Sequence, residues 1–193
     1  VVEDINMRHT NGRYHPGLEL PATMWASLHP AVVLNDASIV ILAIPSQTLR
    51  ENLAKWRQFL ADDAVVVSLI KGIELGTVMR MSQVIAEVAQ IPESRVAVLS
   101  GPNLAREIAQ RQPAATTVAC ASEESAMQLA DAITTAYFRP YYTTDGVGVE
   151  IGGSVKNVIA LANGMAVGLG FGENTQSSLI TRGLAEMTRL GVA

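Results

Sequence analysis

Residues 38–46 read Ser-Ile-Val-Ile-Leu-Ala-Ile-Pro-Ser, and this run decides the class of fold. It is a continuous apolar run rich in isoleucine, which is typical of a strand covered on both faces. Pro45-Ser46 ends the run. An amphipathic helix is predicted next, over residues 47–60, because apolar side chains recur there at helical spacing. These side chains are Leu49, Leu53, Trp56 and Leu60.

The alternation of strand and helix continues along the chain. Further strands are predicted at residues 64–69, 95–99, 115–120 and 137–143. Helices are predicted between them at residues 78–89, 104–110 and 123–134. Strands joined by helices at this spacing indicate right-handed crossovers and a mostly parallel sheet, so we expect an α/β protein.

The segment before this alternation is less regular. Residues 1–10 resemble the end of a helix, with Asn11-Gly12 as its stop. The remaining predictions are a loop at residues 14–17, a short strand at 24–27 and a short helix at 30–35.

After Asp145 only helical patterns follow, and we place a domain boundary near residues 144–146. Residues 154–169 form a helix that is apolar on nearly every side, so we expect it to be buried. Glycine and alanine four residues apart form a smooth strip for close backbone approach, at Ala160, Gly164 and Gly168. Its one cation, Lys156, needs a polar partner if it is buried, unless it snorkels to the surface.

Composition excludes several functional classes. The chain has 193 residues, is 49% hydrophobic and carries a net charge of −4, which suits a folded core of one domain or slightly more. No basic stripe predicts nucleic-acid or membrane binding, no run is long enough to span a membrane, and no signal peptide is recognised. One cysteine, Cys120, excludes an internal disulfide and fits a cytoplasmic location. The three histidines lack metal-ligand spacing, so no metal site is expected.

Three predicted strands end in loops with unusual residues, at Pro45-Ser46, Lys71-Gly72 and Gly101-Pro102-Asn103. Ligands of open parallel sheets bind beyond the carboxyl ends of the strands, so we expect these loops to share one crevice. Each loop also has a structural interpretation. Ser46 would cap the following helix, and Lys71 would simply reach solvent. The third loop would be a turn, although Pro102 near a helix start also leaves free N–H groups for an anion.

Two lysines in one cleft would suit a phosphate dianion or a developing oxyanion. If Lys71 and Lys156 lie close together, each lowers the pKa of the other, and burial adds to the effect. A lysine held in this way transfers a proton near neutral pH.

These residues resemble the bacterial NAD(P)-dependent glycerol-3-phosphate dehydrogenase family. The first matching motifs are Ala43-Ile44-Pro45-Ser46, Ile70-Lys71-Gly72-Ile73-Glu74, Ser100-Gly101-Pro102-Asn103-Leu104-Ala105 and Gly153-Ser154-Val155-Lys156-Asn157-Val158-Ile159-Ala160. Two more are Gly168-Leu169-Gly170-Phe171-Gly172-Glu173-Asn174 and Thr181-Arg182-Gly183-Leu184-Ala185-Glu186. The resemblance covers essentially the whole chain.

The resemblance implies an enzyme that interconverts sn-glycerol 3-phosphate and dihydroxyacetone phosphate, and so supplies glycerol 3-phosphate for phospholipid synthesis. It implies that Lys156 is the general acid/base on the substrate oxygen, with Asn157 beside it. It further implies that Gly101 and Asn103 bind substrate, and that Lys71 contacts both substrate and cofactor.

The cofactor implied by the resemblance is NAD or NADP, bound by Pro45, Ser46, Lys71 and Ala105. The choice between the two is left open, because it is made at a second strand that the family places before Val1. Residues 1–144 would form a Rossmann-like dinucleotide-binding domain with an incomplete sheet, and residues 145–193 the start of an all-helical substrate domain. A homodimer is a further expectation.

Some features depart from the family pattern. Ser154 stands where alanine is usual, and Val167 where an acidic residue is common. The glycine-rich pyrophosphate turn is absent, and the family continues well past Ala193. We therefore expect an internal fragment, inactive and marginally stable by itself. Two alternatives stay open at this point: a related hydroxy-acid dehydrogenase with a helical second domain, and a non-catalytic dinucleotide-binding module.

Overall fold

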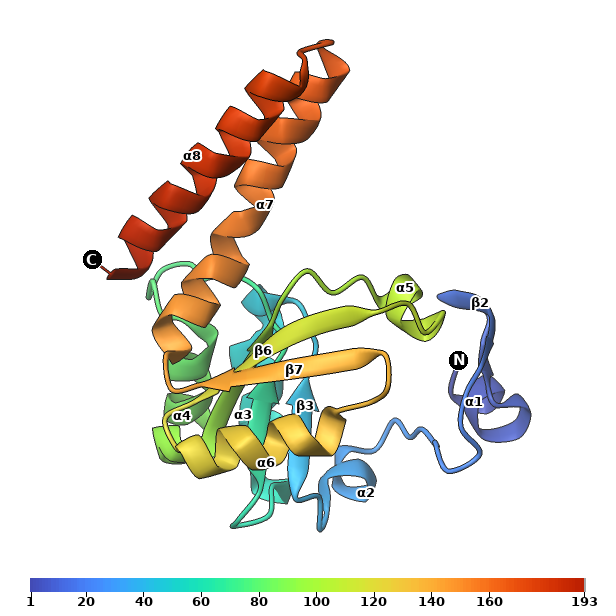
Figure 1. The fold of residues 1–193 in the computed structure, drawn as a ribbon. Helices are drawn as coiled ribbons and strands as arrows, with labels where there is room; N and C mark the ends of the chain where they lie inside the picture. The colour runs from blue at the N-terminus through green and yellow to red at the C-terminus, as the bar shows by residue number, and fades with distance from the viewer. Residues whose placement is uncertain (193) are drawn as a thin grey trace.

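A five-stranded sheet organises the computed structural model, which describes residues 1–192 (Figure 1). Its strands lie in the order β3 (Ile39–Leu42), β4 (Val65–Ser68), β5 (Val96–Ser100), β6 (Ala114–Cys120) and β7 (Phe138–Thr143). Neighbouring strands are parallel except β5 and β6, so the predicted mostly parallel α/β sheet is confirmed. The link from β5 to β6 contains only the five-residue helix α5 (Ala105–Ala109), which is too short for a crossover.

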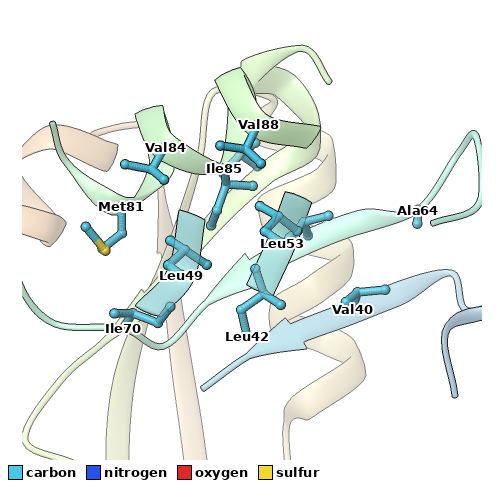
Figure 2. Packing of buried hydrophobic residues seen from close by; sticks show 12 residues of the cluster. Val40, Leu42, Leu49, Leu53, Ala64, Ile70, Met81, Val84, Ile85 and Val88 are labelled. Atoms are coloured by element: carbon cyan, nitrogen blue, oxygen red, sulfur yellow. The ribbon is translucent and has the colours of Figure 1, made fainter. Parts of the chain in front are cut away.

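Helices cover both faces of the sheet. On one face lie α3 (Leu49–Trp56) and α4 (Met81–Ala89), and 3-10 turns at Ser46–Thr48 and Arg57–Phe59 flank α3. Figure 2 shows their apolar side chains packed against the strands. On the other face lies α6 (Glu123–Ile133), whose buried residues pack on β4, β5 and β6. The helices predicted at these places are confirmed.

Helix α4 begins later than the expected residue 78. Val78 has a positive φ of 59°, and Gly76 has one of 87°, so the backbone forms a turn before the helix. Another 3-10 turn, Glu93–Arg95, precedes β5.

Strand β3 differs from its prediction in one respect. Val40 and Leu42 are buried, but Ile39 and Ile41 are 39% and 52% exposed. Helix α3 covers the first pair, whereas α6 packs on the strands beyond β3. The expectation that this strand is covered on both faces is therefore wrong for the residues that the structure describes.

The N-terminal segment contains a helix and a hairpin. The predicted helix is present as α1 (Val2–Arg8), but it ends at the C-cap His9, before the expected stop at Asn11-Gly12. Strand β1 (Thr10–Asn11) follows directly and pairs antiparallel with β2 (His15–Glu19). The loop expected at residues 14–17 is thus wrong from His15 onward. Helix α2 (Pro30–Leu34) is confirmed.

No strand forms at residues 24–27, contrary to expectation. The side chain of Asn6 instead exchanges two hydrogen bonds with the backbone of Ala26. These bonds hold the backbone of this segment against α1 rather than in a ladder.

The last two helices, α7 (Gly146–Gly168) and α8 (Glu173–Val192), form an antiparallel pair that projects from the sheet (Figure 1). Helix α7 starts earlier than predicted, because the side chain of Asp145 caps it by accepting a hydrogen bond from Gly148 N at 2.8 Å. No helix among residues 1–192 is both long and apolar enough to cross a membrane.

Helix α7 was predicted to be buried, and this prediction is wrong for most of its length. Val158, Leu161 and Met165 are 68%, 62% and 59% exposed, because α7 packs on the sheet at its start and on α8 along one side only. The smooth strip is also wrong, since a Cβ at Gly164 or Gly168 would meet nothing within 4 Å. The close approach to α8 uses Gly183 instead, where a Cβ would lie 2.7 Å from Ile159.

Candidate active site

The three loops that follow β3, β4 and β5 lie along one edge of the sheet, as predicted, because these strands are parallel. The first two loops touch. Gly72 has a φ of +138°, and a Cβ on it would lie 3.0 Å from the Oγ of Ser46. Only glycine takes this conformation without strain, so the second loop can approach the first closely.

Helix α7 closes over the second and third loops. A Cβ at Gly153 would lie 2.5 Å from the Oγ of Ser100 and 3.9 Å from Cγ of Lys71. Three residues further on, the ammonium of Lys156 donates a hydrogen bond to the carbonyl oxygen of Gly101 at 3.1 Å. The polar partner that Lys156 was predicted to need is therefore this backbone carbonyl.

An open cleft of about 240 Å³ lies at this junction. Its lining includes Ser100, Gly101, Gly153 and Lys156. A larger cavity of about 400 Å³ lies elsewhere, between the N-terminal hairpin and α5, and contains none of the predicted site residues. The predicted catalytic residue, Lys156, lines the smaller cleft and not the larger cavity.

The charge of Lys156 acts on Lys71 in the predicted direction. The pKa of Lys71 is lowered from its ordinary value, chiefly because burial removes part of its water and also because Lys156 is positively charged. The Lys71 residue nevertheless remains exposed, so it does reach solvent. An added anion would relieve the repulsion between two cations in this arrangement.

Two expectations for the loops, one structural and one functional, are wrong. Ser46 does not cap a helix: it begins a 3-10 turn, and its Oγ accepts a bond from Gln47 Nε2 at 3.3 Å. Pro102 is not near the first helical position, since α5 begins at Ala105 after the N-cap Leu104. The expectation that Pro102 lies at the start of this helix is therefore wrong.

The remaining predicted residues are not among those that line the cleft. The amide nitrogen of Asn103 donates to the carbonyl of Ala115 at 2.8 Å, while its buried Oδ1 has no hydrogen-bond partner among the described residues. Ala105 is exposed at the start of α5. Asn157 is exposed beside Lys156 in α7, and its side chain makes no hydrogen bond to another described residue.

Sequence reasoning missed a buried ion pair behind the cleft. The carboxylate of Glu150, 4% exposed, accepts from Arg80 Nη1 at 2.5 Å and from Ser82 N at 2.8 Å. This pair fastens the first turns of α7 to α4. A usable signal existed, because a glutamate in the apolar, glycine-rich stretch 146–153 needs a partner when it is buried.

The other candidates for chemistry are structural. Cys120 is buried, donates weakly to the carbonyl of Ser94 at 3.3 Å, and has a pKa raised by burial, as suits a core residue. Over the part of the chain that the structure describes, no group of three or more metal-ligating side chains comes together.

The fold and the site together define a class: an α/β protein with a Rossmann-like, mostly parallel sheet, whose carboxyl edge is closed by a lysine-bearing helix. Family models for the N-terminus and the C-terminus of NAD-dependent glycerol-3-phosphate dehydrogenase match residues 1–126 and 145–193. The chain belongs to this family.

Individual relatives agree with this membership. The chain is 58% identical over 193 residues to the glycerol-3-phosphate dehydrogenase, NAD(P)+, of Streptomyces griseus, covering all of this chain and 57% of that protein. The glycerol-3-phosphate dehydrogenase structure from Coxiella burnetii is 33% identical with a TM-score of 0.87, covering 98% and 57%. That from Plasmodium falciparum is 31% identical with a TM-score of 0.88, covering 96% and 52%.

The chain thus spans little more than half the length of the curated relatives it matches.

Proposed function

We propose that the protein carrying this chain is an oxidoreductase that interconverts sn-glycerol 3-phosphate and dihydroxyacetone phosphate with NAD or NADP. The observation that carries the proposal is the position of Lys156 over the carbonyl of Gly101, with the lowered pKa of Lys71 nearby. Family membership supplies the reaction type. The glycerol 3-phosphate formed would serve phospholipid synthesis.

The residues present fit a nicotinamide dinucleotide at the carboxyl edge of the sheet. Any side chain at position 72 would contact Ser46. Because Gly72 has none, a ligand can approach the backbone of this loop closely. The unpartnered Oδ1 of Asn103 leaves an acceptor for a donor group of the substrate. Pro45, Ser46, Lys71 and Ala105 would hold this cofactor, which supplies or accepts a hydride when bound.

The chemistry of this chain is then proton transfer and charge stabilisation. In the reductive direction Lys156 donates a proton from its ammonium to the substrate oxygen as negative charge develops there, and in the oxidative direction it takes the proton back. Lys71 offsets the charge of the phosphorylated substrate. Gly101, Asn103 and Asn157 position the substrate beside Lys156.

We assign residues 1–144 to the dinucleotide-binding part and residues 145–193 to the start of the helical substrate domain. The single cysteine favours a reducing compartment, and we place the enzyme in the cytoplasm on that basis. We also propose a homodimer, which sedimentation would test.

The direct test is turnover by the complete protein. Dihydroxyacetone phosphate should cause oxidation of NADH or NADPH, which is measured as a loss of absorbance at the nicotinamide band. Unphosphorylated dihydroxyacetone should be a poor substrate. The matched pair isolates the phosphate contribution. Equal rates with the two substrates, or no rate with either, would show that the proposal is wrong.

A further inference from the structure

We propose that Ser154 is a positioning residue, which ties the Lys71-Gly72 loop to helix α7 and so sets how Lys71 lies relative to Lys156. This inference rests on the proposed function, because it assigns both lysines to the same substrate site. Ser154 itself would touch neither substrate nor cofactor.

The side chain of Ser154 makes a hydrogen bond in each direction. Its Oγ accepts from the backbone N–H of Gly72 at 3.1 Å and donates to the carbonyl of Glu150 at 2.8 Å. Gly72 and Ser154 are 82 residues apart in sequence, so this bond joins the sheet edge directly to the helix. It is the one hydrogen bond that the Gly72 N–H makes within residues 1–192.

The bond lies between the two lysines along the chain. Gly72 directly follows Lys71, and Ser154 precedes Lys156 by two residues on the same helix. The stem of Lys71 lies close to α7 beside this bond, since a Cβ at Gly153 would be 3.9 Å from Lys71 Cγ, an ordinary contact distance. A shift of the second loop away from α7 would therefore move the Lys71 ammonium away from Lys156.

The bond from Ser154 to the carbonyl of Glu150 orients the hydroxyl so that it can accept from the Gly72 N–H. A serine hydroxyl has one proton, and donating it to the carbonyl of Glu150 leaves the lone pairs of Oγ facing the Gly72 N–H. Glu150 is itself held by Arg80 and Ser82, so the carbonyl that orients Ser154 belongs to a fixed turn of α7. Alanine, the residue usual at this place in the family pattern, would leave the Gly72 N–H without this partner.

Serine hydroxyls in helices often bond the carbonyl four residues back with no further role, and α7 and α8 offer a matched comparison. Ser178 in α8 donates to the carbonyl of Asn174 at 2.7 Å and has no bond to a loop. Replacing it removes the same kind of helix bond without touching the cleft.

The test uses the complete protein with Ser154→Ala, Ser154→Thr and the control Ser178→Ala. We expect Ser154→Ala to lower kcat/KM for dihydroxyacetone phosphate by about three- to tenfold, the effect of one net hydrogen bond, mainly through KM. Ser154→Thr keeps the hydroxyl and should restore most of the loss, and Ser178→Ala should change nothing. An unchanged kcat/KM in Ser154→Ala, or an equal loss in Ser154→Thr, would overturn the proposal.

Hydrogen exchange at the Gly72 amide gives a readout that does not depend on activity. The amide should exchange several-fold faster in Ser154→Ala than in the wild type and in Ser178→Ala. Equal exchange rates in the three proteins would overturn the inference. If the wild type fails to turn over dihydroxyacetone phosphate, the proposed function fails, while the exchange rates still decide whether Ser154 holds the loop.

Discussion

The ammonium of Lys156 donates a hydrogen bond to the carbonyl oxygen of Gly101 at 3.1 Å, which holds helix α7 against the loop that follows β5. The bond gives the lysine a fixed direction while its remaining two protons stay available. The position of this one ammonium group is the basis for the assigned chemistry.

Replacement of Lys156 tests its catalytic role. Lys156→Ala in the complete protein should lower turnover of dihydroxyacetone phosphate by at least about 100-fold, because general acid catalysis of this kind contributes roughly that much or more. The dissociation constant of the nicotinamide cofactor, measured by fluorescence, should stay nearly unchanged. Lys55→Ala is the control, since Lys55 is exposed and pairs only with Glu51. Unchanged turnover in Lys156→Ala would show that Lys156 is not the general acid/base.

The contact between Gly153 and Ser100 predicts a destabilising substitution and its rescue. Gly153→Ala would place a Cβ 2.5 Å from Ser100 Oγ and should lower the free energy of unfolding by about 1–3 kcal/mol, as overpacking does. Adding Ser100→Ala should recover most of the loss, because the Cβ of residue 100 is 3.4 Å away. Denaturant unfolding measures both effects.

The neighbouring glycine is the control for that experiment. A Cβ at Gly152 would meet only the end of Met187, at 3.7 Å, so Gly152→Ala should leave stability unchanged or raise it slightly. If the two alanine variants unfold alike, the close approach of α7 to β5 is contradicted.

Loss of the Glu150 carboxylate should loosen the start of α7. Glu150→Ala leaves Arg80 without its partner and should lower the free energy of unfolding by about 3 kcal/mol, as expected for a buried pair. Glu186→Ala removes two exposed ion pairs in α8, with Arg182 and Arg189, and should lower the free energy of unfolding far less. Equal effects in the two variants would show that Glu150 is not a tie between α7 and α4.

The pKa of Lys71 gives a prediction about charge. Lys156→Met should raise the pKa of Lys71 by removing a nearby cation, yet leave it below its ordinary value because desolvation is the larger cause. NMR titration of the Lys71 ammonium measures the change. A pKa that does not rise in this variant would place the two side chains too far apart to interact.

The same lowered pKa has a consequence for stability. As pH rises past the lowered pKa, the folded state loses the Lys71 proton before the unfolded state does. The unfolded state then binds more protons, so the free energy of unfolding rises with pH up to the ordinary lysine value. Lys71→Met should show a smaller rise over this window in denaturant unfolding; an identical pH profile would contradict the assignment.

The sequence predicted the crevice because its evidence is local. Each apolar run, such as residues 38–44, indicates a strand, and the residues after each run must then lie at its end. Once the strands are parallel, Ser46, Lys71 and Asn103 have to share an edge. No long-range contact needs to be known for this deduction.

The missed features depend on contacts between distant residues. The apolar pattern of α7 indicates that burial of this helix is favourable, but it does not show which residues would pack on it. In the described chain Leu161 remains exposed. Ser154 and Gly72, or Glu150 and Arg80, are bonded across 82 and 70 residues, and neither residue of a pair indicates its partner by pattern alone. The antiparallel entry of β6 likewise follows from a connection that is too short, not from the apolar run itself.

The five strands lie side by side in the order in which they occur in the chain (Figure 1). During synthesis each new strand can therefore pair with the strand made just before it, and none of the described strands has to be inserted between two older ones. Helix α7 is made after all five strands. The residues that form the crevice loops are thus synthesised before Lys156, and their strands can pair without it.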